Sequence, residues 1–168
     1  AAAGATVLLV KRLTGSAIIG VAIGLGLATT PVVWVNATRA DPHPIHLAFV
    51  AFLLLALLRW HDARREPGDD PEAQRRADRR LVVAAILFGL AAGNHSLTLL
   101  LVPPIALFVL SVEPGIWRRW KLVLGCLAAA VGTVALVYLE LPIRGGLLPA
   151  PLIYAKPATW DGFWYIAL

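Results

Sequence analysis

The chain contains no methionine and a single cysteine, Cys126, and only ten of its 168 residues are acidic. A lone cysteine inside an apolar run excludes both a disulfide framework and a cysteine-based metal site. Because the chain starts with neither a methionine nor the charged region of a signal peptide, we interpret it as an internal fragment of a larger protein. The motifs of phosphate-binding loops, nucleophile elbows and paired catalytic carboxylates are also missing from the sequence.

Apolar residues, by contrast, are abundant. They make up 59% of the chain, and the mean hydropathy is +0.76. Both values exceed what a soluble domain of this length normally carries, so the composition predicts a protein that lies in a lipid bilayer.

All but three of the fifteen Lys and Arg residues form three short clusters that are separated by long apolar stretches. The clusters are Lys11 and Arg12; Arg59, Arg64, Arg65, Arg75, Arg76, Arg79 and Arg80; and Arg118, Arg119 and Lys121. Short cytoplasmic loops retain Lys and Arg, so we expect these clusters to face the cytoplasm. A net charge of +5 also fits nucleic-acid binding, but charge confined to loops beside membrane segments argues against it, and we expect no nucleic-acid partner.

This pattern predicts an all-α fold: one polytopic transmembrane helical bundle over residues 1–168, with about five membrane segments and a partial N-terminal helix. We expect helices near 1–12, 16–36, 44–60, 81–93, 96–111 and 120–140, a cytoplasmic loop at 61–80 and an outward segment at 141–168.

Glycine and proline add detail to these helices. Gly20 and Gly24 have the spacing that lets two helices approach closely, and Gly125 and Gly132 are expected to pack in the same way. Pro31 is expected to kink the outer end of its helix.

Residues 81–110 would form one helix near 45 Å long, which is too long for a bilayer without strong tilt. A hairpin that turns at residues 93–96 keeps the flanking basic clusters on one side, whereas a single crossing separates them. Gly93, Asn94 and Ser96 are also typical of turns and helix caps, so we predict the hairpin.

Most of the remaining polar residues fall in segments that face outward in this topology: 39–46, 94–96, 140–144, Lys156 and Asp161. Ionisable groups at membrane depth are costly and usually functional, so their shared sidedness predicts a site near the outer interface. Asp41, His43, His46 and His95 are candidate metal ligands, but the prolines between them break regular spacing. Hydrogen bonding by neutral histidines is the simpler interpretation, and we expect no metal.

Taken in order, several segments resemble the protein O-mannosyltransferase-like membrane family, once catalogued as a domain of unknown function, in the glycosyltransferase C superfamily. They are Val10–Gly15, Trp34, Asp41–His46, Phe88–His95, Tyr138–Arg144 and Trp160–Trp164. The family's Glu-x-Tyr-x-x-His pattern is replaced here by an acid at Asp41 and a histidine at His46, with two prolines between them.

The resemblance implies an integral membrane glycosyltransferase that moves a sugar, such as mannose, from a polyprenyl-phosphate donor to a protein or glycan acceptor on the outer face. It also implies a catalytic base in a loop that would precede residue 1, no cofactor, and supporting catalytic roles for Asp41 and His46. Arg144 and Lys156 are expected to bind the lipid phosphate, since a guanidinium matches phosphate bidentately. Asn94 and His95 are expected to hydrogen-bond the sugar or phosphate.

Two other classes fit the same pattern. A transporter or flippase for a lipid-linked or anionic substrate would use the polar cluster as its translocation site, and it would show internal repeats. The chain would alternatively be a non-catalytic membrane subunit. The composition, rich in Ala, Arg and Gly, indicates a GC-rich bacterial genome, so we expect a multi-pass protein of a bacterial inner membrane.

Overall fold

The computed structural model describes residues 1–39, 42–65, 70–147 and 155–167, and this part of the chain contains helices and turns with no strand. The elements are α1 (Ala2–Thr14), α2 (Ala17–Thr29), α3 (Pro31–Ala37), α4 (His43–Arg65), α5 (Pro71–Asn94), η1 (Ser96–Leu101), α6 (Val102–Val112), η2 (Ile116–Arg118), α7 (Trp120–Tyr138), α8 (Glu140–Pro142), η3 (Ile143–Leu147) and α9 (Trp160–Ala167). The predicted all-α class is confirmed.

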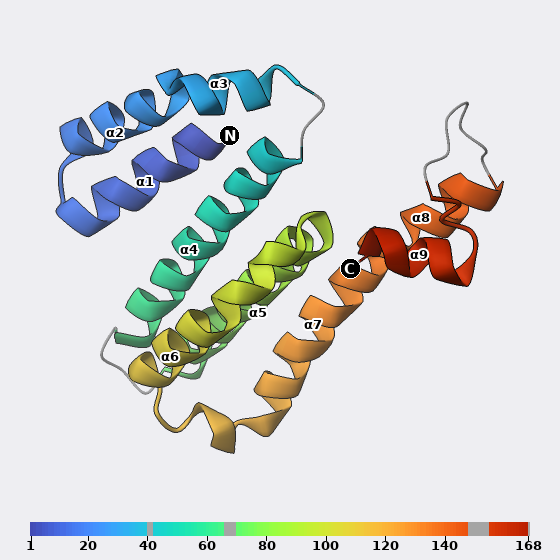
Figure 1. Cartoon of the computed structure of the whole chain (residues 1–168). Helices are drawn as coiled ribbons and strands as arrows, with labels where there is room; N and C mark the ends of the chain where they lie inside the picture. The colour runs from blue at the N-terminus through green and yellow to red at the C-terminus, as the bar shows by residue number, and fades with distance from the viewer. Residues whose placement is uncertain (40–41, 66–69, 148–154, 168) are drawn as a thin grey trace.

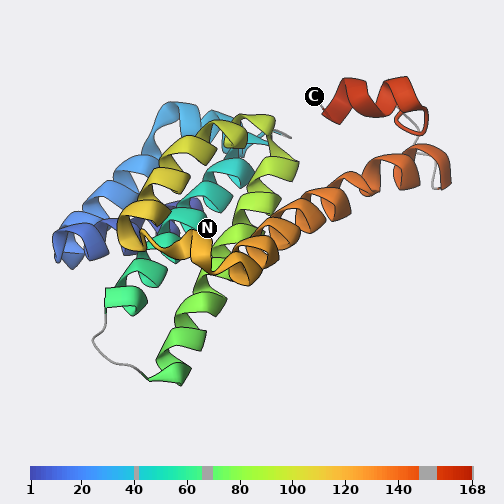
Figure 2. The ribbon, with the colours of Figure 1, turned by 90° about the horizontal axis from the view of Figure 1, so that it is seen from below.

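The long helices α4, α5 and α7 lie side by side, and α1 and α2 form a pair that packs on α4 (Figure 1). The core lies between α4 and α5, where Leu53, Leu57 and Trp60 meet Leu81 and Ala84. Ile105, Phe108 and Val109 of α6 cover this core. Seen from below, α7 leaves the other helices and carries the C-terminal elements away from them (Figure 2).

The membrane spans are supported in part. By length and composition, α4 and the stretch Trp120–Leu147 are able to cross a membrane, and α2 with α3 adds a third span if the bent pair is counted as one. The five expected segments are not all supported. The first half of α5 carries four arginines, and the apolar stretch Ser96–Val112 is only 17 residues long.

Close packing at glycine is confirmed at one predicted pair. A Cβ at Gly20 would lie 2.7 Å from the Val7 carbonyl oxygen, and one at Gly24 would collide with the Val7 side chain, so α1 and α2 approach closely here. The same expectation for Gly125 and Gly132 is wrong, because nothing lies within 4 Å of a Cβ at either position. Gly89 and Gly93 instead provide the close contact with α7.

The predicted loop at 61–80 is largely helical. Helix α4 continues to Arg65, and α5 already starts at Pro71, where Asp70 accepts hydrogen bonds from the N–H groups of Glu72 and Ala73. Proline fits the first turn of a helix because it has no N–H to satisfy, so Pro71 starts a helix rather than breaking one.

Breaks at proline and at the hairpin tip agree with the sequence. Helices α2 and α3 meet at Thr30 with a bend of 61°, as expected from Pro31. Helix α5 ends at Asn94, and η1 begins at Ser96, so the chain turns within the predicted hairpin segment.

Candidate functional site at the histidine end

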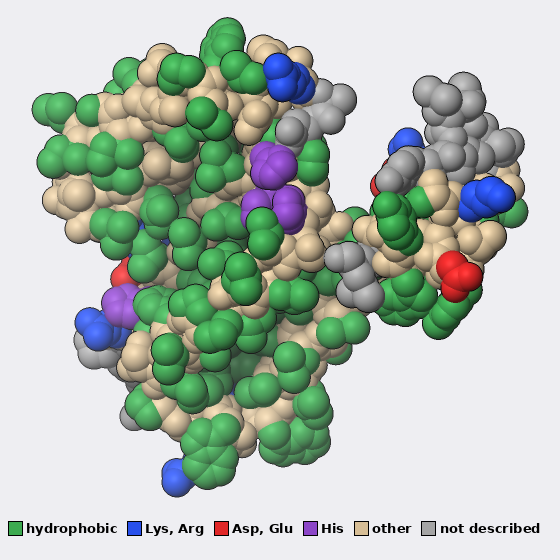
Figure 3. Space-filling model, viewed as in Figure 1, with side chains coloured by type: hydrophobic (Ala, Val, Ile, Leu, Met, Phe, Trp, Pro, Cys, Tyr) green, Lys and Arg blue, Asp and Glu red, His purple; other side chains and the backbone are tan. Residues whose placement is uncertain are grey.

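The three histidines of the predicted outward segments gather at one end of the bundle, which we call the histidine end. The ring of His95 lies between the other two, with centroid separations of 5.1 Å to His43 and 5.2 Å to His46. Figure 3 shows purple histidine side chains grouped on this face. The first turn of α4 and the hairpin tip thus bring residues about fifty positions apart into contact.

Thr98 ties the cluster together from within. Its side chain is completely buried, and its hydroxyl donates to the His95 carbonyl oxygen over 2.9 Å. The hydroxyl oxygen of Thr98 also lies 3.5 Å from His46 Nδ1, so it is a weak acceptor for a proton on that nitrogen. One hydroxyl therefore contacts both the His95 backbone and the His46 ring.

The hydrogen bonds of His95 constrain its tautomer. Its Nδ1 accepts from the backbone N–H of Leu97 over 3.3 Å and so caps the start of η1. Since Nδ1 acts as an acceptor, the neutral ring carries its proton on Nε2. That N–H is the donor that His95 has left for a ligand.

Asn94 fastens the hairpin tip to α4. Its Nδ2 donates to the Pro42 carbonyl oxygen over 3.1 Å. Its Oδ1 is an acceptor that this bond does not use. Asn94 is therefore fixed in place while keeping hydrogen-bonding capacity on one side.

A pocket of about 590 Å³ opens beside the cluster. Asn94, His95 and Ser96 form one part of its wall, and Tyr138 and Glu140 come from the far end of α7 and from α8. Its remaining lining is apolar and includes Phe49, Leu90 and Val137. A concave apolar pocket with a few converging polar groups is typical of small-molecule sites, and the volume falls in their usual range.

The other predicted site residues lie at varying distances from this pocket. Arg144 is largely exposed, and its Nε donates to Glu140 over 2.6 Å, so it joins the pocket wall only through Glu140. Lys156 is exposed in a left-handed backbone conformation with φ of 49° and does not line the pocket. Asp41 lies outside the described residues.

No group of three or more His, Cys, Asp or Glu side chains in the described ranges is arranged to hold a metal ion. The three histidines pack edge to face or tilted.

Comparison with known protein families gives a match. Residues 5–116 match the family model of the protein O-mannosyl-transferase TMEM260 N-terminal domain, which covers two thirds of the chain. The chain belongs to this family. Neither a curated protein nor a solved structure matches it.

The family assignment supports a glycosyltransferase-type function and a membrane location. The matched segment includes the three histidines, Asn94 and Thr98. Glu140, Arg144 and Lys156 lie beyond it, so the pocket joins a wall of the family domain to a wall outside it.

Sequence reasoning missed Thr98 and the pocket role of Tyr138. Thr98 follows His95 by three residues, which is the spacing that aligns side chains in a 3₁₀ turn, so a signal was available. No comparable signal marks Tyr138, because its place in the pocket depends on how α7 crosses α5.

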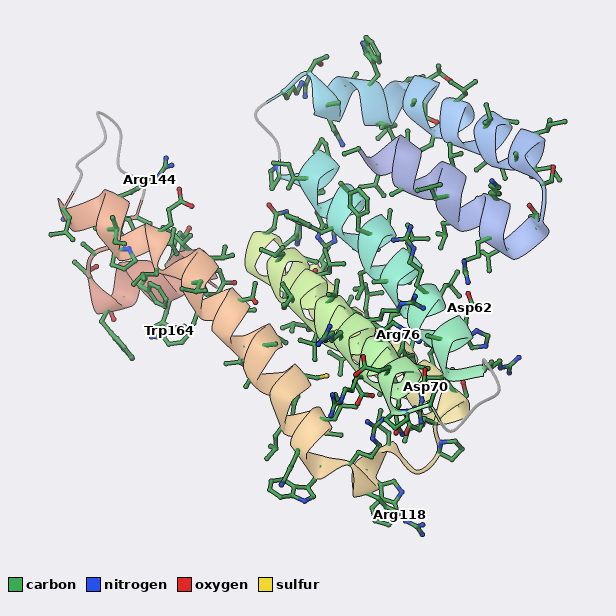
Figure 4. All side chains as sticks on the ribbon, turned by 180° about the vertical axis from the view of Figure 1, so that it is seen from behind. Asp62, Asp70, Arg76, Arg118, Arg144 and Trp164 are labelled. Atoms are coloured by element: carbon green, nitrogen blue, oxygen red, sulfur yellow. The ribbon has the colours of Figure 1, made fainter. Side chains whose placement is uncertain are left out.

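Sequence reasoning also missed a set of ion pairs at the opposite end, which we call the arginine end. Glu113 accepts from Arg64 over 2.8 Å and from Arg119 over 3.4 Å, and Arg119 also pairs with Asp78. A further pair, between Arg12 and Asp62, joins α1 to α4. Figure 4 shows Asp62, Asp70, Arg76 and Arg118 at this end, and Arg144 and Trp164 on the C-terminal elements beyond α7.

These pairs also act on Arg119 itself. Burial opposes the charge of its guanidinium, but hydrogen bonds and charge attraction from Asp78 and Glu113 outweigh burial and raise its pKa above the ordinary value. Arg119 is therefore a permanent cation that links η2 to α5.

Proposed function

We propose that this chain is the membrane-embedded part of a glycosyltransferase that moves a sugar, such as mannose, from a polyprenyl-phosphate donor to a hydroxyl of a protein or glycan acceptor. The observation that carries the proposal is the pocket at the histidine end, where Asn94 and His95 of the family domain meet Glu140.

In this proposal the histidine end faces the outer side of the membrane and the arginine end faces the cytoplasm. The distribution of Lys and Arg supports this orientation. The apolar part of the pocket wall, which includes Phe49, Leu90 and Val137, suits the first isoprene units of a lipid carrier. A donor that enters sideways from the bilayer would then place its phosphate and sugar among the polar groups.

Each polar group has a role that fits its hydrogen-bonding capacity. The Nε2–H of His95 donates to a sugar or phosphate oxygen, and Asn94 Oδ1 accepts from a sugar hydroxyl. Arg144 stabilises the phosphate as the bond between the sugar carbon and the phosphate oxygen breaks. The acceptor hydroxyl forms the new bond to the sugar carbon and passes its proton to a base. Asp41 and His46 have supporting roles in binding the acceptor.

The direct test is sugar transfer by the full-length protein, reconstituted with a polyprenyl-phosphate-mannose donor and an acceptor peptide. We expect His95→Ala and Asn94→Ala each to lower kcat/KM about tenfold to a hundredfold, which is the usual cost of losing one positioned hydrogen bond to a charged or reacting group.

His61→Gln is the matched control, because His61 lies at the arginine end beside Asp62. Transfer at the wild-type rate by the His95 and Asn94 variants would remove the pocket from the reaction. Movement of the intact lipid-linked sugar across the bilayer without transfer would instead support the transporter interpretation.

A further inference from the structure

A second, differently built groove lies at the arginine end between α4 and α5, with a volume of about 470 Å³. On α4 it is lined by Phe52, Leu55, Ala56 and Arg59, and on α5 by Arg79, Arg80, Val83 and Leu87. These positions repeat every three or four residues, so they form one continuous stripe on each helix.

The groove has an apolar part and a strongly basic part. Phe52 and Val83 are exposed and stand where the helices are most apolar, while the three arginines lie together toward the arginine end. Along the helices, the lining thus changes from hydrocarbon to cationic within about two turns, roughly 11 Å. A phospholipid has the same order of parts, with an acyl chain below an anionic phosphate.

The arginines of this groove differ from their neighbours in how they are paired. Arg64 and Arg119 are neutralised by Glu113 and Asp78. Within the part of the chain that the structure describes, Arg59, Arg79 and Arg80 form no ion pair, and no carboxylate lines the groove. Three uncompensated guanidiniums beside one another repel, so an anion placed among them relieves that repulsion.

One of these arginines is also held in position. The Nη1 of Arg80 donates to the Arg59 carbonyl oxygen over 3.0 Å, which joins α5 to α4. A guanidinium has five N–H donors, so this bond leaves most of them for a ligand. The groove is thus partly organised before anything binds.

We infer that the α4–α5 groove is a binding site for an anionic phospholipid of the bilayer, with its headgroup phosphate on Arg59, Arg79 and Arg80 and one acyl chain along Phe52, Val83 and Leu87. Basic pockets between membrane helices bind anionic headgroups by this combination of charge and hydrocarbon contact. The site lies at the opposite end from the proposed sugar-transfer pocket, and the inference does not rest on the proposed function.

Native mass spectrometry of the full-length protein, titrated with phosphatidylglycerol or phosphatidylcholine, tests the inference. We expect phosphatidylglycerol to bind at least about tenfold more tightly than phosphatidylcholine. The double variant Arg59→Gln and Arg79→Gln should lose about tenfold to thirtyfold in phosphatidylglycerol affinity, because each basic residue contributes about a factor of five near an anionic headgroup. Arg80 is left unchanged because its bond to Arg59 also supports the fold.

The double variant Arg75→Gln and Arg76→Gln is the matched control. It removes the same total charge, but both residues lie in α5, neither lines the groove, and they pair with Glu72 and Asp70. Its affinity should stay within about twofold of the wild type. Equal binding of both lipids, or equal losses in the two double variants, would overturn the inference.

Competition decides between the bilayer lipid and the sugar carrier. If polyprenyl phosphate displaces phosphatidylglycerol one for one from the wild type but not from the Arg59 and Arg79 variant, the occupant is the carrier and the assignment to phospholipid is wrong. If polyprenyl phosphate leaves phosphatidylglycerol bound, the assignment stands.

Discussion

Thr98 is fully buried among helices whose other buried side chains are mostly alanine and leucine, and its hydroxyl contacts both His46 and His95. A buried polar atom is stable only when its hydrogen bonds are made, so this residue joins packing to the geometry of the site.

We therefore expect Thr98→Val, which keeps the shape and removes the hydroxyl, to lower the free energy of unfolding by about 1 kcal/mol. Sugar transfer should fall as well, because His46 and His95 lose their common partner. Thermal unfolding in detergent and transfer assays measure the two effects. Thr98→Ser keeps the hydroxyl, and it should preserve transfer at a small packing cost; equal loss in both variants would argue against the hydrogen bonds.

Glu140 and Arg144 form an exposed pair one helical turn apart, which contributes only about 0.3–0.5 kcal/mol to stability. In the proposed reaction Glu140 competes with the lipid phosphate for Arg144. We expect Glu140→Gln to tighten polyprenyl-phosphate binding a few-fold and Arg144→Ala to weaken it about tenfold. Binding titrations with the full-length protein measure both, and unchanged affinity in Arg144→Ala would exclude the phosphate role.

Helix α5 packs on α4 along one side and on α7 along another, so the side chains on two of its faces are constrained by neighbouring helices. A Cβ at Gly89 would lie 2.5 Å from the Ala130 carbonyl oxygen, and one at Gly93 would lie 2.9 Å from Val137 Cβ. The crossing of α5 and α7 therefore depends on two glycines one turn apart, and this crossing brings Glu140 into the wall of the same pocket as Asn94.

We predict that Gly89→Ala destabilises the protein by about 1–3 kcal/mol, since α7 must move to admit the methyl group. Gly125→Ala should be neutral or stabilising by up to about 1 kcal/mol, because space is open there and alanine favours helix. Unfolding in detergent compares the two variants on one scale. A neutral Gly89→Ala would show that the helices do not cross as described.

The ends of several helices are joined by Glu113, whose side chain is only 12% exposed and contacts two arginines. Glu113→Gln should cost about 2–4 kcal/mol, because it leaves Arg64 and Arg119 close together with one carboxylate fewer. Glu72→Gln removes an exposed pair and should cost less than about 0.5 kcal/mol. Chemical unfolding of both variants tests whether burial makes this difference.

For the whole molecule, the main feature is the separation of two ends. Helices α4, α5 and α7 run between the arginine end and the histidine end, so residues that are distant in sequence share one end (Figures 1 and 4).

Cysteine labelling of the protein in sealed vesicles tests this separation. In a Cys126→Ser background, cysteines placed at Ser96 and Arg144 should react with a membrane-impermeant reagent from the same side, and one at Arg118 from the other side. Labelling of positions 96 and 144 from opposite sides would separate the two walls of the pocket.

Much of this arrangement could be predicted from the sequence. The helix ends near Pro31 and Asn94 follow from local chemistry, and the family follows from motifs such as Phe88–His95. The pairing of Glu113 with Arg64, and the contact of Gly89 with α7, depend on how helices pack across the chain. A single sequence contains no local pattern for such contacts, which is why Gly125 and Gly132 were assigned the packing that Gly89 and Gly93 provide.

The ion pairs of the arginine end have a consequence for biosynthesis. Arg12, Arg64 and Arg119 find their acidic partners only after α1, α4, α5 and the segment between α6 and α7 have come together. We expect a nascent chain to reach the translocon with these cations unpaired, at the stage when orientation is decided and acidic residues have little influence on it. We expect the orienting charge to be strongest during insertion and to be partly cancelled by these ion pairs in the folded protein.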